Sequence, residues 1–257
     1  IGRIHYEDIR VYGGGQLVSD IQAGNSRCDL LPQGASIFIG AGGPMGQMHV
    51  IRNVCLGISG VRVTGTDLDD PRIEALRRKA EPMAKANGVP LRLVNPQNEE
   101  LDETFSYFAL MAPVGALVAD AIRRAGPGAI INVFAGIPAA VKQAIDLDTY
   151  IANRCFMFGT SGSRLEDMKI VLDKVVSGQL DTNCSVDAVS GMAGAIDGIR
   201  AVEERTLSGK IIVYPALEKM PLLTLPQVCG QYPTVASKLN HGIWTKEAEQ
   251  ELLKVAE

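Results

Sequence analysis

A glycine-rich loop early in the chain has the composition of a phosphate-binding turn. The loop Gly40–Gly46 has the sequence G-A-G-G-P-M-G and directly follows the short apolar run Ala35–Ile39. Glycines let backbone N–H groups approach a pyrophosphate, and the N-terminus of a following helix favours its negative charge. The GxGxxG frame begins at Ala41, so alanine occupies the first glycine position. A tight strand-to-helix turn without a ligand fits the same residues. The residues predicted to bind a pyrophosphate are Gly43, Pro44, Met45 and Gly46.

An acidic residue at a suitable distance strengthens the dinucleotide interpretation. Asp67 follows the predicted strand Val61–Thr66 and lies 21 residues after the last glycine of the loop. A carboxylate at this position accepts hydrogen bonds from the 2′- and 3′-hydroxyls of an adenosine ribose. It repels a 2′-phosphate, which favours NAD over NADP, although Arg62 and Arg72 could offset that preference. We therefore expect Asp67 and the adjacent Leu68 to contact the adenosine half of NAD.

Small residues at later strand ends leave room for the other half of such a cofactor. Predicted strands cover Phe105–Met111, Ile130–Phe134 and Cys155–Phe158, and each is followed by small or hydroxylated residues. Ordinary turns, or an N-cap of the helix near Arg164 in the third case, fit the same residues. The further candidate cofactor contacts are Ala112, Pro113, Ala135, Gly136, Thr160 and Ser161.

Acid–base and metal chemistry have no clear carrier in the sequence. His49 lies on the helix predicted after the glycine loop, where it is expected to be packed or to cap the helix. The five cysteines and three histidines show no zinc-ligand spacing, so no metal site is expected from this chain alone. A Tyr-xxx-Lys pair after the fifth strand and a GxSxG elbow are both lacking. The catalytic residues are therefore unassigned.

The elements that position these residues alternate between strands and helices. Helices are predicted over Met45–Gly57, over Val114–Ala125, and from Asp70-Pro71, which could cap its own helix, to the stop signal Asn87-Gly88. Such alternation predicts an α/β Rossmann fold, a doubly wound parallel sheet flanked by helices, with a C-terminal extension. We expect an N-terminal segment and linker over residues 1–31, an NAD(P)-binding domain over 32–180, and a helix–strand return segment and tail over 181–257.

Composition limits the class of partner. The chain has 257 residues, of which 46% are hydrophobic, so it can bury a substantial core. Its formal net charge of −4 argues against a nucleic-acid-binding surface. No apolar run reaches the roughly 20 residues of a membrane span. Cysteines without a disulfide framework are typical of a cytoplasmic protein, which is the predicted location.

Five motifs together resemble a known family. They are G-A-G-G-P-M-G-Q-M-H-V (40–50), T-D-L-D-D-P-R (66–72), I-N-V-F-A-G-I-P (131–138), F-G-T-S-G-S-R-L-E-D-M (158–168) and S-G-K-I-I-V-Y-P (208–215). The chain resembles the medium-chain dehydrogenase/reductases, the zinc-type alcohol dehydrogenase group, over roughly Pro32–Pro215. The most similar branch is the sugar- and polyol-phosphate reductases of the L-sorbose-1-phosphate reductase type.

The resemblance implies hydride transfer between NAD(P) and an alcohol or ketone, such as a sugar phosphate. By position, the Gly43–Gly46 segment matches the family's pyrophosphate loop and Asp67 matches its ribose-binding acid. Ala112 and Ala135-Gly136 match backbone positions near the nicotinamide. The family also implies a homodimer or higher oligomer.

The chain departs from the family before the glycine loop. The family holds its catalytic zinc in a preceding GroES-like domain, whereas only 39 residues precede Gly40 here. We therefore expect the cofactor-binding portion of a dehydrogenase that is incomplete without that domain. The stretch Tyr6–Gly13 is similar in sequence to Ile151–Gly159. The similarity arises either by chance or because residues 1–25 are the end of an earlier Rossmann unit. In the second case, the strand in Tyr6–Gly13 would pair with the strand in Ile151–Gly159.

Two other functional classes fit part of the pattern. A non-catalytic dimerisation or scaffold module would explain Ala41 and the missing zinc ligands. A Rossmann methyltransferase also carries an acidic residue after its second strand, but the closing segment 208–215 argues against that class.

Overall fold

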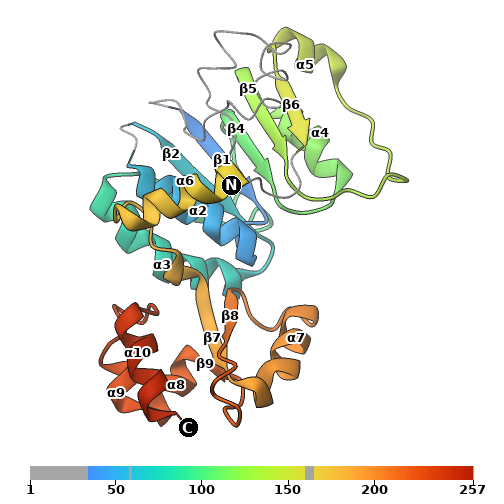
Figure 1. Cartoon of the computed structure of the whole chain (residues 1–257). Helices are drawn as coiled ribbons and strands as arrows, with labels where there is room; N and C mark the ends of the chain where they lie inside the picture. Colours follow the sequence, from blue (N-terminus) through green and yellow to red (C-terminus); the bar gives the residue numbers. More distant parts are fainter. Residues whose placement is uncertain (1–33, 58–59, 160–164, 257) are drawn as a thin grey trace. The chain divides into compact units, whose positions relative to one another are not determined.

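The computed structural model describes residues 34–57, 60–159 and 165–256 of the chain (Figure 1). These residues form two compact units, the first ending at Leu180 and the second beginning at Asp181. Each unit has its own sheet and is treated separately below. The N-terminal stretch Tyr6–Gly13, proposed above to echo a later strand, lies outside the described residues.

The first unit is built on a six-stranded parallel sheet with the strand order β3-β2-β1-β4-β5-β6. The strands are β1 (Ala35–Ile39), β2 (Arg62–Thr66), β3 (Leu91–Val94), β4 (Phe105–Leu110), β5 (Ala125–Val133) and β6 (Phe156–Gly159). The order runs outward in opposite directions from the β1/β4 pair. Open sheets of this kind bind ligands at the carboxyl ends of the strands beside that reversal. The predicted doubly wound Rossmann sheet is therefore confirmed.

Helices cover both faces of this sheet. The helices of this unit are α2 (Pro44–Leu56), α3 (Asp70–Asn87), α4 (Gly115–Arg123), α5 (Leu147–Ala152) and α6 (Leu165–Val176). Neighbouring strand residues point to opposite faces. Ile37 belongs to a core that includes Ile122 of α4, whereas the Phe38 ring lies 6.3 Å from the ring of His49 on α2. Helices α2 and α3 pack together on one face, and α4 packs on the other with α5 beside it (Figure 1).

The ends of α3 follow local stop and start signals, with one correction. The residue that caps the helix is Asp69, whose side chain accepts a hydrogen bond from the Arg72 N–H at 3.0 Å. Asp70 instead accepts a hydrogen bond from the Asn95 side chain at 2.9 Å. At the other end, α3 stops where predicted, because Gly88 adopts the left-handed conformation with φ of 65°.

The fifth strand begins earlier than expected. The predicted strand begins at Ile130, but β5 already starts at Ala125 and includes the turn-like sequence Gly126-Pro127-Gly128. The pairing of β5 with β4 shifts in register between Phe105 and Tyr107, and Gly128 has φ of 72° within the irregular stretch. A bulge of this kind absorbs a proline that a regular central strand would exclude.

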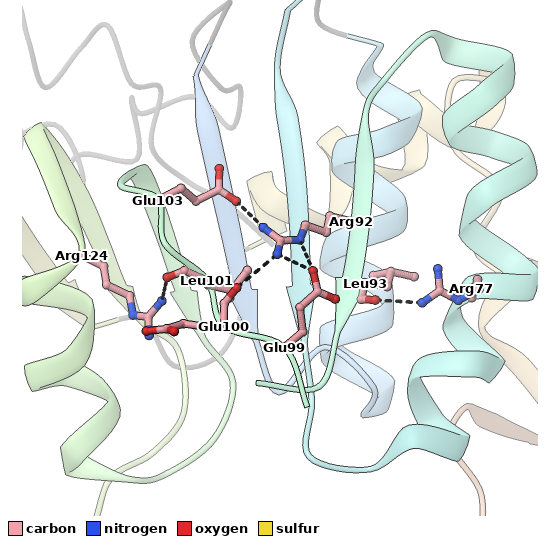
Figure 2. A network of polar contacts seen from close by, with 8 residues as sticks. All are labelled: Arg77, Arg92, Leu93, Glu99, Glu100, Leu101, Glu103 and Arg124. Atoms are coloured by element: carbon pink, nitrogen blue, oxygen red, sulfur yellow. Dashed lines mark hydrogen bonds and ion pairs between the residues drawn. The ribbon is translucent and has the colours of Figure 1, made fainter. Parts of the chain in front are cut away.

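Arginines fasten the connection between β3 and β4 to the sheet. Arg92 of β3 forms ion pairs with Glu99 and Glu103 of this connection. Arg124, after α4, donates a hydrogen bond to the Leu101 carbonyl at 2.6 Å. Figure 2 shows both arginines pointing toward the connection from opposite sides. Exposed ion pairs of Arg92 and a half-buried hydrogen bond from Arg124 to the Leu101 carbonyl therefore both hold the connection in place.

The second unit contains a three-stranded sheet with the order β8-β7-β9. Strand β7 (Val186–Ser190) pairs parallel with β8 (Lys210–Val213) and antiparallel with the two-residue β9 (Leu223–Thr224). The helices are α7 (Ala195–Glu203), α8 (Leu225–Gln231), α9 (Pro233–Ala236) and α10 (Lys246–Val255), with short 3₁₀ turns at Thr182–Ser185 and Met192–Gly194. The core of this unit includes the fully buried Trp244, packed with Val228, Val235 and Leu252.

The C-terminal extension is more ordered than its sequence predicted. Its first helical segment begins as a 3₁₀ turn at Met192, and the α-helix that follows ends at Glu203. The segment predicted only as a tail contains the helices α8, α9 and α10. None of the helices in the described part of the chain combines the length and apolar character needed to cross a membrane.

Candidate functional site

The carboxyl ends of the central strands meet at one edge of the first sheet. Ile39, the last residue of β1, lies beside Thr66 of β2 and Leu110 of β4. Backbone hydrogen bonds continue past the strands: the Gly40 N–H donates to the Thr66 carbonyl and the Ala135 N–H to the Leu110 carbonyl, at 2.8 and 2.9 Å. The glycine loop and the segments after β2, β4 and β5 therefore share one edge.

Glycine is required where the loop turns into α2. A Cβ on Gly46 would lie 2.2 Å from the Gly40 carbonyl oxygen and 2.5 Å from the Cα of Ala41. Gly40 has φ of 82°, a conformation that side chains disfavour. The first turn of α2 therefore packs directly against the end of β1.

The start of α2 is arranged to attract an anion. Gly43 is the N-cap and offers no side chain, and Pro44 at the first helical position has no N–H. The first intrahelical hydrogen bond runs from the Gln47 N–H to the Gly43 carbonyl. The first turn contains no acidic residue, so the positive end of the helix dipole is not neutralised there. Met45 is 37% exposed at this end.

The Asp67 carboxylate lies against the glycine loop. Its Oδ2 accepts a hydrogen bond from the Gly42 N–H at 2.8 Å, and its Oδ1 accepts one from the Asp69 N–H at 3.2 Å. A Cβ on Gly42 would lie 2.6 Å from the Cβ of Arg72 and 2.8 Å from the same Oδ2. A carboxylate has about four acceptor positions, so these two hydrogen bonds leave capacity for about two further donors.

Gln47 holds the other side of the same loop, and the sequence interpretation missed it. Its Nε2 donates to the Gly42 carbonyl at 3.0 Å, and its Oε1 accepts from Lys79 Nζ of α3 at 3.2 Å. The Gly42 N–H is thus held by Asp67 and the Gly42 carbonyl by Gln47. Gln47 is fully buried, as are most residues of α2. A polar residue directly after the last loop glycine was the available signal.

The predicted contacts on the nicotinamide side are placed as follows. Ala112 and Pro113 follow Met111, the first residue after β4, and the Ala112 carbonyl accepts a hydrogen bond from the Val114 N–H. Gly136, just beyond β5, has no atom of the described residues within 4 Å of where a Cβ would lie. Leu68 is 63% exposed beside Asp67, and its carbonyl accepts from Asn95 Nδ2 at 3.1 Å. Thr160 and Ser161 lie outside the described residues.

His49 is packed inside the protein. Its side chain is 1% exposed, and its Nδ1 lies 2.7 Å from the Met45 carbonyl oxygen. Burial lowers its pKa from 6.5 to about 4; the hydrogen bond to Met45 opposes that shift and the charge of Arg52 adds to it. The imidazole is therefore neutral near pH 7. Within the three described ranges, no three His, Cys, Asp or Glu side chains lie close enough together to hold a metal ion.

Comparison with known proteins gives distant relatives in sequence. No family model matches the chain. The uncharacterized protein YggP of Escherichia coli (strain K12) is 27% identical over 254 residues, covering 88% of this chain and 58% of YggP. The L-sorbose 1-phosphate reductase of Klebsiella pneumoniae is 25% identical over 243 residues, covering 88% of this chain and 56% of the reductase. The chain therefore spans a little over half the length of these relatives.

Solved structures share the fold at lower identity. Alcohol dehydrogenase TADH from Thermus sp. ATN1 superposes with a TM-score of 0.58 at 17% identity, covering 71% of this chain and 53% of that one. The L-idonate 5-dehydrogenase of E. coli gives 0.56 at 15% identity, covering 71% and 50%. The 2R,3R-butanediol dehydrogenase of Bacillus subtilis gives 0.55 at 16%, covering 72% and 51%. The chain thus resembles the zinc-type alcohol dehydrogenase group in fold and, distantly, L-sorbose 1-phosphate reductase in sequence, as its motifs predict.

Proposed function

We propose that this chain binds NAD(H) and forms the cofactor-binding portion of an alcohol or sugar dehydrogenase. The observation that carries the proposal is the Asp67 carboxylate, which is hydrogen-bonded to the Gly42 N–H beside the uncapped start of α2. A helix N-terminus for the pyrophosphate and a carboxylate for the ribose are the two features by which Rossmann domains bind dinucleotides. Here both features come from one loop and the strand next to it.

Each candidate residue has a role in this proposal. Backbone N–H groups of Gly43, Met45 and Gly46 face the pyrophosphate, and Pro44 fixes the direction of the helix start. Asp67 accepts the ribose hydroxyls, and Leu68 lies against the adenine side. The bound nicotinamide would accept or donate a hydride at its C4 carbon. The residues that leave room for its ring and for a substrate beside it are Ala112, Pro113, Ala135 and Gly136. Thr160 and Ser161, which follow β6 in the sequence, are proposed to hydrogen-bond the cofactor or a substrate phosphate.

The proposed substrate is an alcohol or ketone of the sugar-phosphate class. The support is the similarity to L-sorbose 1-phosphate reductase, which extends over 88% of this chain. The described residues do not fit a zinc site, so no step is assigned to zinc within them. We propose that polarisation of the substrate oxygen belongs to a zinc-binding GroES-like domain, since the chain spans 58% and 56% of the two curated relatives.

Isothermal titration of the full chain with NADH, NADPH and ADP-ribose tests the cofactor proposal. We expect NADH and ADP-ribose to bind with similar enthalpies, because they share the pyrophosphate and the ribose that contacts Asp67. NADPH should bind at least about tenfold more weakly, because its 2′-phosphate faces a carboxylate. Lack of binding at millimolar NADH and ADP-ribose would contradict the proposal and favour a scaffold role.

We also propose that the protein is a homodimer joined at β6. Among the described strands, β6 ends the sheet and pairs with β5 alone. Unpaired strand edges readily accept a further strand. Light scattering should give a mass near twice that of the 27.4 kDa chain, and a monomer at high micromolar concentration would rule this assembly out.

A further inference from the structure

His49 lies between the two ends of the candidate site. Its Nδ1 is 2.7 Å from the carbonyl oxygen of Met45, in the first turn of α2. Its ring meets the ring of Phe134 edge to face, with centroids 4.9 Å apart and planes at 72°. Phe134 directly precedes Ala135, at the end of β5. One side chain therefore contacts both the pyrophosphate side and the nicotinamide side.

The chemical state of His49 is defined by its surroundings. A carbonyl oxygen accepts only, so Nδ1 carries the proton and donates to Met45. The Nε2 atom is then a bare acceptor, and it is buried without a hydrogen-bond partner among the described residues. Packing alone would be served better by leucine or phenylalanine, because a buried acceptor without a partner is costly. The presence of histidine at position 49, with both a hydrogen-bond donor and an aromatic ring, therefore needs an explanation other than packing.

We propose that His49 is a positioning residue that keeps the first turn of α2 and the end of β5 in register for a dinucleotide. The inference rests on the proposed function, because it concerns the same cofactor site. The hydrogen bond fixes the ring relative to Met45, and the ring edge fixes Phe134 and the backbone after it. The distance between the pyrophosphate and nicotinamide subsites then depends on this one side chain.

The helix itself suggests a variant that separates the two contacts of His49. Four residues later, Asn53 donates from its Nδ2 to the His49 carbonyl at 2.7 Å, so an asparagine can make this type of hydrogen bond within α2. His49→Asn should keep the donor to Met45 and lose the ring against Phe134. Phe134→Leu should lose the same ring contact from the other side while leaving His49 in place.

The test compares NADH with ADP-ribose, which lacks the nicotinamide, on the full chain. We expect His49→Asn and Phe134→Leu each to weaken NADH about tenfold and ADP-ribose by less than about twofold. The fluorescence of bound NADH should also move toward that of free NADH. A purely structural role would lower thermal stability and weaken both ligands alike, or neither.

The control is an aromatic pair of the same geometry on the opposite face of the sheet. Phe105 meets Phe108 edge to face at 5.7 Å and 74°. Phe105→Leu should cost stability but leave the ratio of NADH to ADP-ribose affinity unchanged. If both His49→Asn and Phe134→Leu keep the wild-type ratio while the wild type binds both ligands, the positioning role is wrong. If the wild type binds neither ligand, the cofactor proposal itself fails.

Discussion

At the scale of single residues, Asp67 has two tasks that mutation can separate. Its carboxylate accepts a hydrogen bond from the Gly42 N–H, which stabilises the glycine loop. Its remaining acceptor positions are available for a ligand at the edge of the sheet. We expect Asp67→Ala to weaken NADH about tenfold or more and to change NADPH much less, because repulsion of the 2′-phosphate disappears with the charge. Titration of both cofactors gives this ratio directly.

The neighbouring Asp69 provides the control for that change. Its side chain caps α3 through the Arg72 N–H, so Asp69→Ala also removes a negative charge close by and costs about 1 kcal/mol of stability. The NADH-to-NADPH preference should nevertheless stay close to wild type. An equal loss of preference in both variants would show that net charge, and not the position of Asp67, sets the choice.

Gly46 tests how closely the helix start must pack. Because a Cβ would lie 2.2 Å from the Gly40 carbonyl, Gly46→Ala should force α2 outward and destabilise the protein by about 3 kcal/mol. Urea unfolding measures the loss. Gly136→Ala is the matched change: its Cβ would meet no neighbour within 4 Å in the described part of the chain, so it should cost less than about 0.5 kcal/mol. Equal effects would contradict the close packing of the loop.

His49 links stability to pH with a definite sign. Its pKa is about 4 in the fold and 6.5 when unfolded, so the unfolded chain binds the extra proton first. The contribution is complete above pH 6.5 and is lost as pH falls toward 4, by about 2 kcal/mol between pH 7 and pH 5. His49→Asn should remove this part of the acid destabilisation, as seen in urea midpoints at the two pH values. An unchanged pH dependence would mean that the imidazole is not buried.

At the scale of elements, the two arginines that hold the β3–β4 connection, Arg124 and Arg92, differ in how exposed their side chains are. Arg124 is about 29% exposed and donates to the Leu101 carbonyl and to Asp120, whereas Arg92 is 39% exposed in its ion pairs (Figure 2). Exposed ion pairs contribute little, but a half-buried carbonyl that loses its donor costs more. We expect Arg124→Met to cost about 2 kcal/mol and Arg92→Met less than about 1 kcal/mol in urea unfolding. The reverse order would mean that the charge pairs dominate.

Elements with strong local signals were predictable from the sequence. Strand β1 follows from a short apolar run, and α3 ends at Gly88 because only glycine adopts that conformation easily. Strand β7 was missed because V-D-A-V-S is short and is stabilised by β8 and β9, which come much later in the chain. The glycine-loop residues came from a motif, whereas Gln47 acts through contacts with Gly42 and Lys79 that only the fold brings together.

At the scale of the whole molecule, the two units contain different probes. The candidate site lies in the first unit, whereas the single tryptophan of the chain, Trp244, is buried in the core of the second. Tryptophan emission therefore reports on the fold of the second unit alone. A ligand stabilises only the state to which it binds, by about 2.7 kcal/mol at 100 times its dissociation constant.

This separation makes the location of cofactor binding measurable. The six-stranded sheet and its helices contribute most to the far-UV circular dichroism signal. We expect ADP-ribose to raise the urea midpoint of the circular dichroism transition more than the urea midpoint of the Trp244 fluorescence transition. ADP-ribose suits the measurement because it lacks the nicotinamide that absorbs Trp244 emission in NADH. Asp67→Ala should reduce the shift of the first unit and leave the Trp244 transition as it was. A shift confined to Trp244 would place the nucleotide in the second unit and overturn the assignment of the site to the edge of the Rossmann sheet.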